Sequence, residues 1–277
     1  MCGMLISFFK NSTISKNILR SMIYCLSIGS VFIVWYFGTK YKVNLYVRFE
    51  NIPPPYEVGV QALHTIFSKG YVVNIIYSIK RILFGFFIAA FSGVILGVCA
   101  GRYKIVNLLL MPAIELLRPI PAIAWVPLSI MLWPGTESSI VFITFLGAFF
   151  PVLVNTLYGV QSMDGVLIRA AKSLGAGELS LVIYVILPGV LPAVFTGLEI
   201  GMGVAWVSLI AAEMIAGQFG VGYFTWESYS LVNYPSIVLG MITIGVLGLI
   251  CSSGIRFIGS RIMPWKALTR GGKHDKQ

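Results

Sequence analysis

The chain has 277 residues, of which 57% are hydrophobic and 11% charged, and its formal net charge is +10. Soluble domains carry about 25% charged residues, so this composition excludes an ordinary soluble protein and indicates an integral membrane protein surrounded by lipid. The positive charge could suggest nucleic-acid binding, but the Lys and Arg residues gather at the ends of apolar segments, so we expect no nucleic-acid partner.

Six apolar runs without charged residues are long enough, or nearly so, to cross a bilayer as helices, which requires about 20 residues. These runs cover 21–39, 82–101, 119–136, 138–163, 179–198 and 228–255. The sequence therefore predicts an all-α polytopic membrane protein with about six transmembrane helices.

The first segment, 1–70, is expected to hold one helix over 21–39, kept as a signal anchor, followed by an outer loop. Three prolines at 53–55 predict extended backbone in that loop. A core with the other five helices follows over 71–258, and 259–277 forms a basic tail.

The second helix is expected to start within 72–82 and to end at Gly101. Lys80 and Arg81 lie near its start, where we expect them to extend to the outer headgroups. Small residues repeat along it and predict close packing against another helix; they are Gly85, Gly93, Gly97 and Gly101.

The third helix, over 105–133, should be irregular because it contains Pro112, Pro119, Pro121 and Pro127. Breaks at membrane depth are tolerated where protein or a water-filled cavity covers them, so this helix is expected to face the interior or a pore. Glu115 and Arg118 stand three residues apart on it. That spacing allows a pair, which could be structural or part of a substrate site.

The fourth helix, 139–160, carries Pro151 and Asn155, and the fifth, 188–213, carries Glu199 about 16 Å along its axis. An ionisable residue at mid-bilayer is a candidate functional residue, although a structural ion pair or a protonated, hydrogen-bonded Glu would also fit. Glu213 is expected at the solvated outer end.

An outer loop over 216–235 should contain a short interfacial helix, because it holds aromatic residues of the kind that favour this depth; they are Tyr223, Phe224, Trp226 and Tyr229. The sixth helix is expected over 237–257.

The positive charges predict the orientation of the six helices. With both termini cytoplasmic, thirteen Lys or Arg residues lie inside: Lys10, Lys16, Arg20, Arg102, Lys104, Arg169, Lys172, Arg256, Arg261, Lys266, Arg270, Lys273 and Lys276. The four outside are Lys40, Lys42, Arg48 and Lys69. Because positive residues are retained on the cytoplasmic side, the polar loop 164–178 should also be cytoplasmic.

No catalytic or metal-binding constellation is visible in the sequence. His64 and His274 are isolated, and the four cysteines have no CxxC spacing. A phosphate-binding Gly-rich loop is missing as well, so we expect the chain to bind no cofactor and to hydrolyse no ATP by itself.

The cytoplasmic segment 164–188 contains the most specific pattern, RAAKSLGAGELSLVIYVILP over 169–188. It resembles the EAA loop of ABC-importer permeases, because Ala170, Ala171, Gly175, Leu187 and Pro188 match that pattern at its spacing, while Arg169 replaces its Glu. In that family the loop forms a short helix that docks into a groove of a separate ATPase subunit.

The resemblance extends to LRPIPAIAWVPLSIMLW (117–133), LGAFFPVLVNT (146–156) and TGLEIGMGVAWVSLIAAEMI (196–215). These segments are similar to the permease branch for nitrate, aliphatic sulfonates, taurine and bicarbonate. The resemblance implies the type I ABC importer permease fold in a bacterial inner membrane. It also implies a homodimer, partner ATPase subunits that bind the ATP, and a periplasmic or lipid-anchored solute-binding protein.

The candidate pore-lining residues are Glu199, Glu115, Arg118 and Asn155. Glu199 stands where this branch often has a basic or neutral residue, and a carboxylate in a pore disfavours a simple anion. That departure favours a zwitterion or a neutral heterocycle over nitrate, unless Glu199 faces away.

Two other classes of function remain open. One is a stand-alone secondary carrier or channel with Glu199 as the coupling-ion site, although no internal repeat supports an inverted-repeat carrier. The other is an intramembrane enzyme, which the lack of a paired nucleophile, base or metal ligand disfavours.

Overall fold

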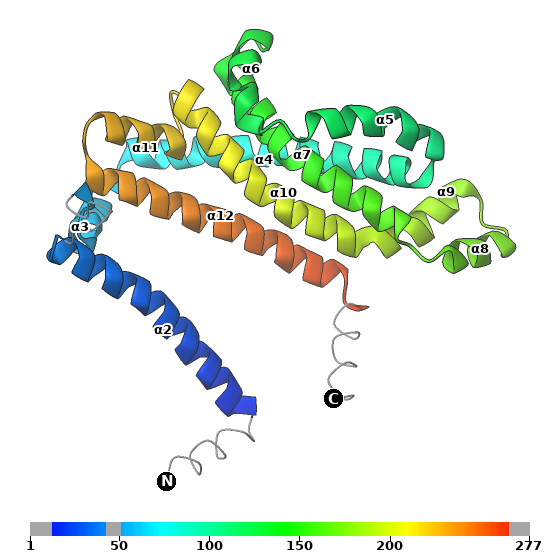
Figure 1. Cartoon of the computed structure of the whole chain (residues 1–277), viewed down its shortest axis with the longest axis horizontal. Helices are drawn as coiled ribbons and strands as arrows, with labels where there is room; N and C mark the ends of the chain where they lie inside the picture. The colour runs from blue at the N-terminus through cyan, green and yellow to red at the C-terminus, as the bar shows by residue number, and fades with distance from the viewer. Residues whose placement is uncertain (1–12, 43–50, 266–277) are drawn as a thin grey trace.

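The computed structural model describes residues 13–42 and 51–265, and every element in this part of the chain is helical. Five helices are long and apolar enough to cross a membrane, and the number is six if one bent pair is counted as a single span. The predicted all-α polytopic fold with about six spans is thereby confirmed. Three of the long helices lie side by side as a bundle: α4 (Lys69–Arg102), α7 (Thr136–Gln161) and α10 (Leu187–Ala216) (Figure 1).

Close approach of α4 to α7 depends on the glycines that the sequence singled out. A Cβ placed on Gly97 would lie 2.7 Å from the Cβ of Thr156, and one on Gly101 would lie 2.5 Å from the Cβ of Val160. Real Cβ atoms do not approach so closely, so only glycine permits this helix separation. The prediction of close helix packing is confirmed.

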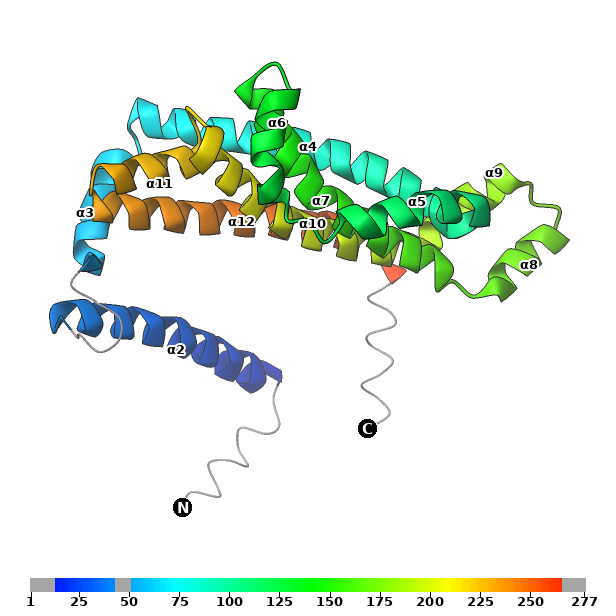
Figure 2. The same cartoon turned by 45° about the horizontal axis from the view of Figure 1, so that its top comes forward.

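Two helices pack against one side of this bundle. Helix α12 (Tyr234–Ile262) packs beside α10, and the short α11 (Val221–Ser230) lies against α12, α10 and α4 at one end (Figure 1). Helix α2 (Thr13–Lys40) stands apart from the bundle and contacts α3 (Pro55–Thr65) (Figure 2). The indole Nε1–H of Trp35 donates to the carbonyl of Pro53 at 3.0 Å and fixes the end of α2 to this connection.

Helix α3 was not predicted, because the three prolines at 53–55 suggested extended backbone throughout. Pro54 is indeed extended, with φ −67° and ψ 154°, but Pro55 then starts the helix. Proline is favoured at the first helical position, where its missing N–H would have no partner inside the helix. The prediction of extended backbone therefore holds at Pro54 and is wrong at Pro55.

The predicted third helix is divided in two. Helix α5 (Lys104–Leu117) ends before Pro119, and a 3-10 turn (Ala122–Trp125) leads into α6 (Val126–Leu132) after a bend of 87°. Pro119 and Pro121 lie in the break, whereas Pro112 is inside α5 and Pro127 is near the start of α6. Two of the four prolines thus cause the break, and it lies against the middle of α7 and α10 (Figure 2).

Candidate functional site

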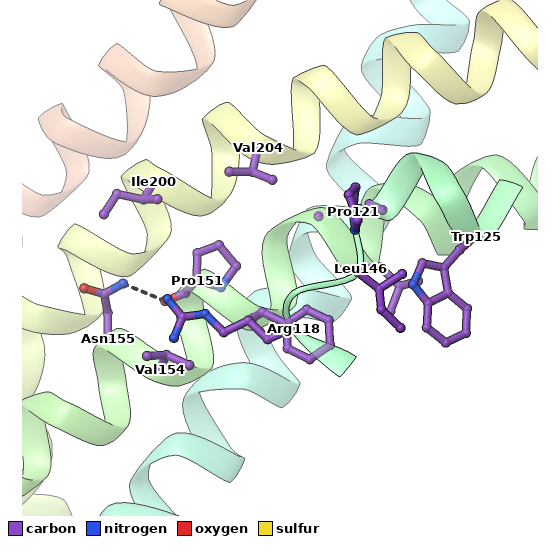
Figure 3. Close-up of a pocket in the computed structure, with 13 residues that line it drawn as sticks. Arg118, Pro121, Trp125, Leu146, Pro151, Val154, Asn155, Ile200 and Val204 are labelled. Carbon is purple, nitrogen blue, oxygen red and sulfur yellow. Dashed lines mark hydrogen bonds between the residues drawn. The ribbon is translucent and has the colours of Figure 1, made fainter. Parts of the chain in front are cut away.

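Residues at the break between α5 and α6 line a cavity of about 330 Å³, together with the middle turns of α7 and α10 (Figure 3). The lining residues are Arg118, Ile120, Pro121, Ala122, Trp125, Leu146, Gly147, Phe150, Pro151, Val154, Asn155, Ile200 and Val204. Helix α7 has 26 residues and is about 39 Å long at 1.5 Å per residue, and its lining residues lie between Leu146 and Asn155, around and just past its midpoint. The cavity therefore lies near the mid-depth of the membrane.

Two polar side chains on the candidate list belong to this cavity wall. The Arg118 guanidinium points toward Pro151 and Asn155 (Figure 3). The Asn155 Nδ2 donates a hydrogen bond to the Pro151 carbonyl at 2.8 Å. This bond orients the Asn155 side-chain amide along α7.

Glu115 and Glu199 do not line the cavity. The Glu115 side chain is exposed, and the ion pairs among the described residues do not include one between it and Arg118. Glu199 is half-buried on α10 next to the cavity-lining Ile200, and successive residues of a helix point about 100° apart. That these two residues line the translocation path stays a prediction.

The segment predicted to contact a partner contains a well-defined short helix, α8 (Gly165–Ser173). Its N-terminus is capped by Asp164, whose carboxylate accepts from the Val166 N–H at 2.8 Å. Helix α8 lies beyond the bundle, at the opposite end of the molecule from α3 and α11 (Figure 1).

Gly175 ends α8 in a left-handed conformation with φ +84°. Its N–H donates to the Lys172 carbonyl at 3.0 Å, and the Ala176 N–H donates to the Ala171 carbonyl at 3.1 Å. This is the Schellman arrangement, in which a left-handed glycine satisfies the last carbonyls of a helix. Gly175 therefore shapes the end of α8, a role that the spacing of the motif alone did not reveal.

Two ion pairs that share Glu178 connect α8 to the end of α4. Glu178 accepts from Lys172 at 3.0 Å and from Arg102 at 2.8 Å. Glu178 begins the short helix α9 (Glu178–Leu181), which passes through a π-helical turn (Val182–Ile186) into α10. The loop thus continues directly into a helix of the bundle.

The predicted partner-contact residues lie in two places. Arg169, Ala170 and Gly175 are exposed on or just after α8, whereas Ala171 is half-buried against the bundle. Leu187 and Pro188 lie at the start of α10. Three apolar side chains near Ala170 are also exposed, Val166 and Leu167 by about half and Leu174 by 88%.

A buried ionic cluster at the other end of the bundle was missed. Arg81 is only 2% exposed and Glu213 is fully buried, although both were expected at the solvated surface. The Arg81 Nη1–H donates to Glu213 at 2.9 Å and to the Phe219 carbonyl at 2.6 Å, and its other nitrogens donate to Glu137. The expectations for Arg81 and Glu213 were wrong, because each provides the partner that makes burial of the other tolerable.

The histidine and cysteines of the described residues lie apart from one another. His64 is exposed on α3, Cys25, Cys99 and Cys251 are free, and no group of residues in the described segments could hold a metal ion. Cys2 and His274 lie outside the described residues.

Comparison with known proteins identifies the family. Residues 93–264 match the family described as the inner membrane component of binding-protein-dependent transport systems. A putative ABC transporter permease of Methanocaldococcus jannaschii is 38% identical over 240 residues, which cover 86% of this chain and 90% of that protein.

Relatives with more specific names are also similar. The taurine transport system permease TauC of Escherichia coli is 34% identical, with 77% of this chain and 80% of TauC covered. The nitrate import permease NrtB of Leptolyngbya laminosa is 32% identical, with 71% of each chain covered. The chain belongs to the family of binding-protein-dependent inner-membrane permeases and is a permease subunit of an ABC importer.

Proposed function

We propose that this permease subunit works as a homodimer with two separate ATPase subunits and an external solute-binding protein, and that it imports a small solute such as taurine, an aliphatic sulfonate, nitrate or bicarbonate. ATP would be bound and hydrolysed by the partner subunits, and this chain would bind no cofactor. The names of TauC and NrtB support taurine and nitrate within this range.

The observation that carries the proposal is the exposed apolar surface of α8. Val166, Leu167 and Leu174 are exposed beside the small Ala170, at the end of the bundle away from α11. An apolar patch outside the lipid-covered part of a membrane protein is typical of a protein contact surface. Small residues such as Ala170 let the partner approach the helix backbone closely.

The direct connection of α8 to the bundle supports its role in coupling. Glu178 joins α8 to the end of α4, and α9 and the π-helical turn join it to α10. A displacement imposed on α8 by ATP binding would therefore act on α10, which lines the cavity.

The homodimer is supported by the face that α10 leaves uncovered. Thr196, Ile200, Gly203 and Val207 are exposed at helical spacing on one face of α10, beside the cavity. A second copy placed against this face would enclose a path between the two chains. Because the pore would then lie between copies, Glu199 on the same helix remains a candidate lining residue.

We also propose that both termini are cytoplasmic, as the distribution of positive charges indicates. The start of α2 and the end of α12 point toward the same side of the molecule as α8 (Figure 1). A cysteine at Tyr56, which is exposed on α3, should react with an impermeant reagent from the outer side. Reaction from the cytoplasmic side alone would contradict this orientation.

The proposal is tested by capture of the ATPase from native membranes on affinity-tagged permease. Leu174→Glu should abolish capture, because a charge would enter an apolar contact. The matched control is Leu231→Glu, since Leu231 is 73% exposed at the other end of the bundle, between α11 and α12. Equal ATPase recovery with both variants, or no ATPase with the unmodified chain, would contradict the proposal.

A further inference from the structure

The side chain of Arg118 is exposed in this chain and has no partner among the described residues, although it lies beside the middle turns of α7 and α10. Among the described residues, the ion pairs involve Arg81, Arg102 and Lys172, and no side-chain hydrogen bond of Arg118 occurs. The guanidinium projects instead into the cavity between α5, α7 and α10 (Figure 3). An unpaired cation at this depth is costly, so it is a candidate for a functional role.

The other residues of the cavity make Arg118 its dominant polar group. None of the described residues that line the cavity is acidic, and most of the wall is aliphatic, aromatic or proline. Asn155 is the second polar group, and because its Nδ2 is held by the Pro151 carbonyl, its carbonyl oxygen remains an acceptor for a ligand donor. Apolar walls concentrate the field of a single charge, so the cavity should attract anions.

We propose that this cavity is a solute-binding site within the permease itself, in which Arg118 binds the oxyanion group of the transported solute. A guanidinium presents a planar fork of donors that matches carboxylate, sulfonate or nitrate oxygens. The inference rests on the proposed function and adds to it that the permease, and not only the external binding protein, selects the solute by charge.

The location of Glu199 is compatible with this assignment. The sequence suggested that a carboxylate in the path disfavours anions, but Glu199 does not line this cavity. Site volume also fits, since about 330 Å³ is at the small end of the range for ligand pockets and suits a solute of a few heavy atoms.

The predicted attraction of anions into the cavity is tested with a cysteine at Val204, which lines the cavity and is 40% exposed. The four native cysteines are first replaced. We then compare, in detergent, how fast the new cysteine reacts with two thiosulfonate reagents, one anionic with a sulfonate group and one cationic. Arg118→Gln should lower the anionic-to-cationic rate ratio about tenfold, whereas Arg118→Lys should preserve it.

The matched control is Arg256→Gln, which removes one positive charge from α12, where Arg256 donates to Ser253 and does not line the cavity. It should leave the ratio unchanged. Gel filtration of each variant verifies that the fold is retained. An unchanged ratio in Arg118→Gln would overturn the inference, and so would a cysteine at Val204 that neither reagent modifies.

Transport provides the second readout. In vesicles that contain the complete transporter, Arg118→Gln should lower the uptake of taurine and of nitrate more than Arg118→Lys does, and the solute that is transported identifies the oxyanion. The thiosulfonate reaction needs neither ATP nor a partner. The binding site in the cavity and the proposed ATP-driven import can therefore be refuted independently of each other. An unchanged rate ratio in Arg118→Gln, together with ATP-driven uptake by the unmodified chain, would refute the binding site alone. Absence of ATP-driven uptake by the unmodified chain would refute the proposed function.

Discussion

Removing the carboxylate of Glu213 should destabilise the fold more than any substitution at an exposed acidic residue. Glu213 is fully buried and accepts from Ser78 at 2.8 Å, from Arg81 at 2.9 Å and from the Gly222 N–H at 2.9 Å. Arg81 in turn bonds to Glu137 on α7. The cluster therefore joins α4, α7 and α10 to the first turn of α11.

In Glu213→Leu, Arg81 keeps one carboxylate partner, but the buried Gly222 N–H loses its acceptor. Breaking a buried ion pair costs about 3–5 kcal/mol, and an unsatisfied buried donor costs about 1–3 kcal/mol. Because Glu137 still compensates Arg81, we expect a loss near 3–5 kcal/mol in total. For a domain of this size, the loss corresponds to a fall in Tm on the order of 10 °C.

The assay is thermal unfolding of the purified protein in detergent, followed by the loss of its monodisperse gel-filtration peak. Glu227→Leu, at an exposed position of α11, is the control and should change stability by less than about 0.5 kcal/mol. The double variant Arg81→Met with Glu213→Leu should be more stable than the sum of the single variants predicts, because it leaves no unpaired buried charge. Equal Tm values for Glu213→Leu and Glu227→Leu would refute a structural role for the cluster.

Three further predictions concern the glycines and Glu199. Gly175→Ala should reduce ATPase capture, because the left-handed conformation of Gly175 costs a non-glycine residue about 1–2 kcal/mol. The control Gly177→Ala, at φ −70°, should leave capture unchanged. Equal capture with both variants would contradict this role of Gly175. Gly97→Val should prevent α4 and α7 from packing and should lower the Tm. The control Gly245→Val should leave the Tm unchanged, because nothing lies within 4 Å of a Cβ at Gly245. Equal Tm values for the two variants would contradict the prediction. If Glu199 lines the path, Glu199→Gln should change the uptake rate in reconstituted vesicles, and parental rates for both Glu199→Gln and Glu199→Leu would make it a structural residue.

The spans and the glycine contacts could be predicted because they depend on local patterns. Long apolar runs must form helices in lipid, and glycines spaced four residues apart lie on one helix face. Partner residues such as Thr156 for Gly97 could not be named, because the pattern does not say which helix packs against that face.

The buried ionic cluster was unpredictable for a related reason. Arg81 and Glu213 are separated by 132 residues in the sequence, and each lies near the end of an apolar run, where a long polar side chain ordinarily reaches the headgroups. Opposite charges at the same predicted membrane depth on two different helices were the available signal for a pair.

Part of the candidate site could be predicted from local patterns in the sequence. Prolines in the third helix indicated a break that faces a cavity, and Arg118 and Asn155 do line one. The angle of the break, 87°, depends on packing against α7 and α10 and is not encoded in the positions of the prolines.

The most direct test of the account is uptake of radiolabelled taurine and nitrate into proteoliposomes that contain the transporter purified from native membranes with its partners. We predict accumulation that requires both ATP and the solute-binding protein and that is lost in Leu174→Glu. Accumulation driven by a proton or sodium gradient without ATP would contradict the account and would favour a stand-alone secondary carrier.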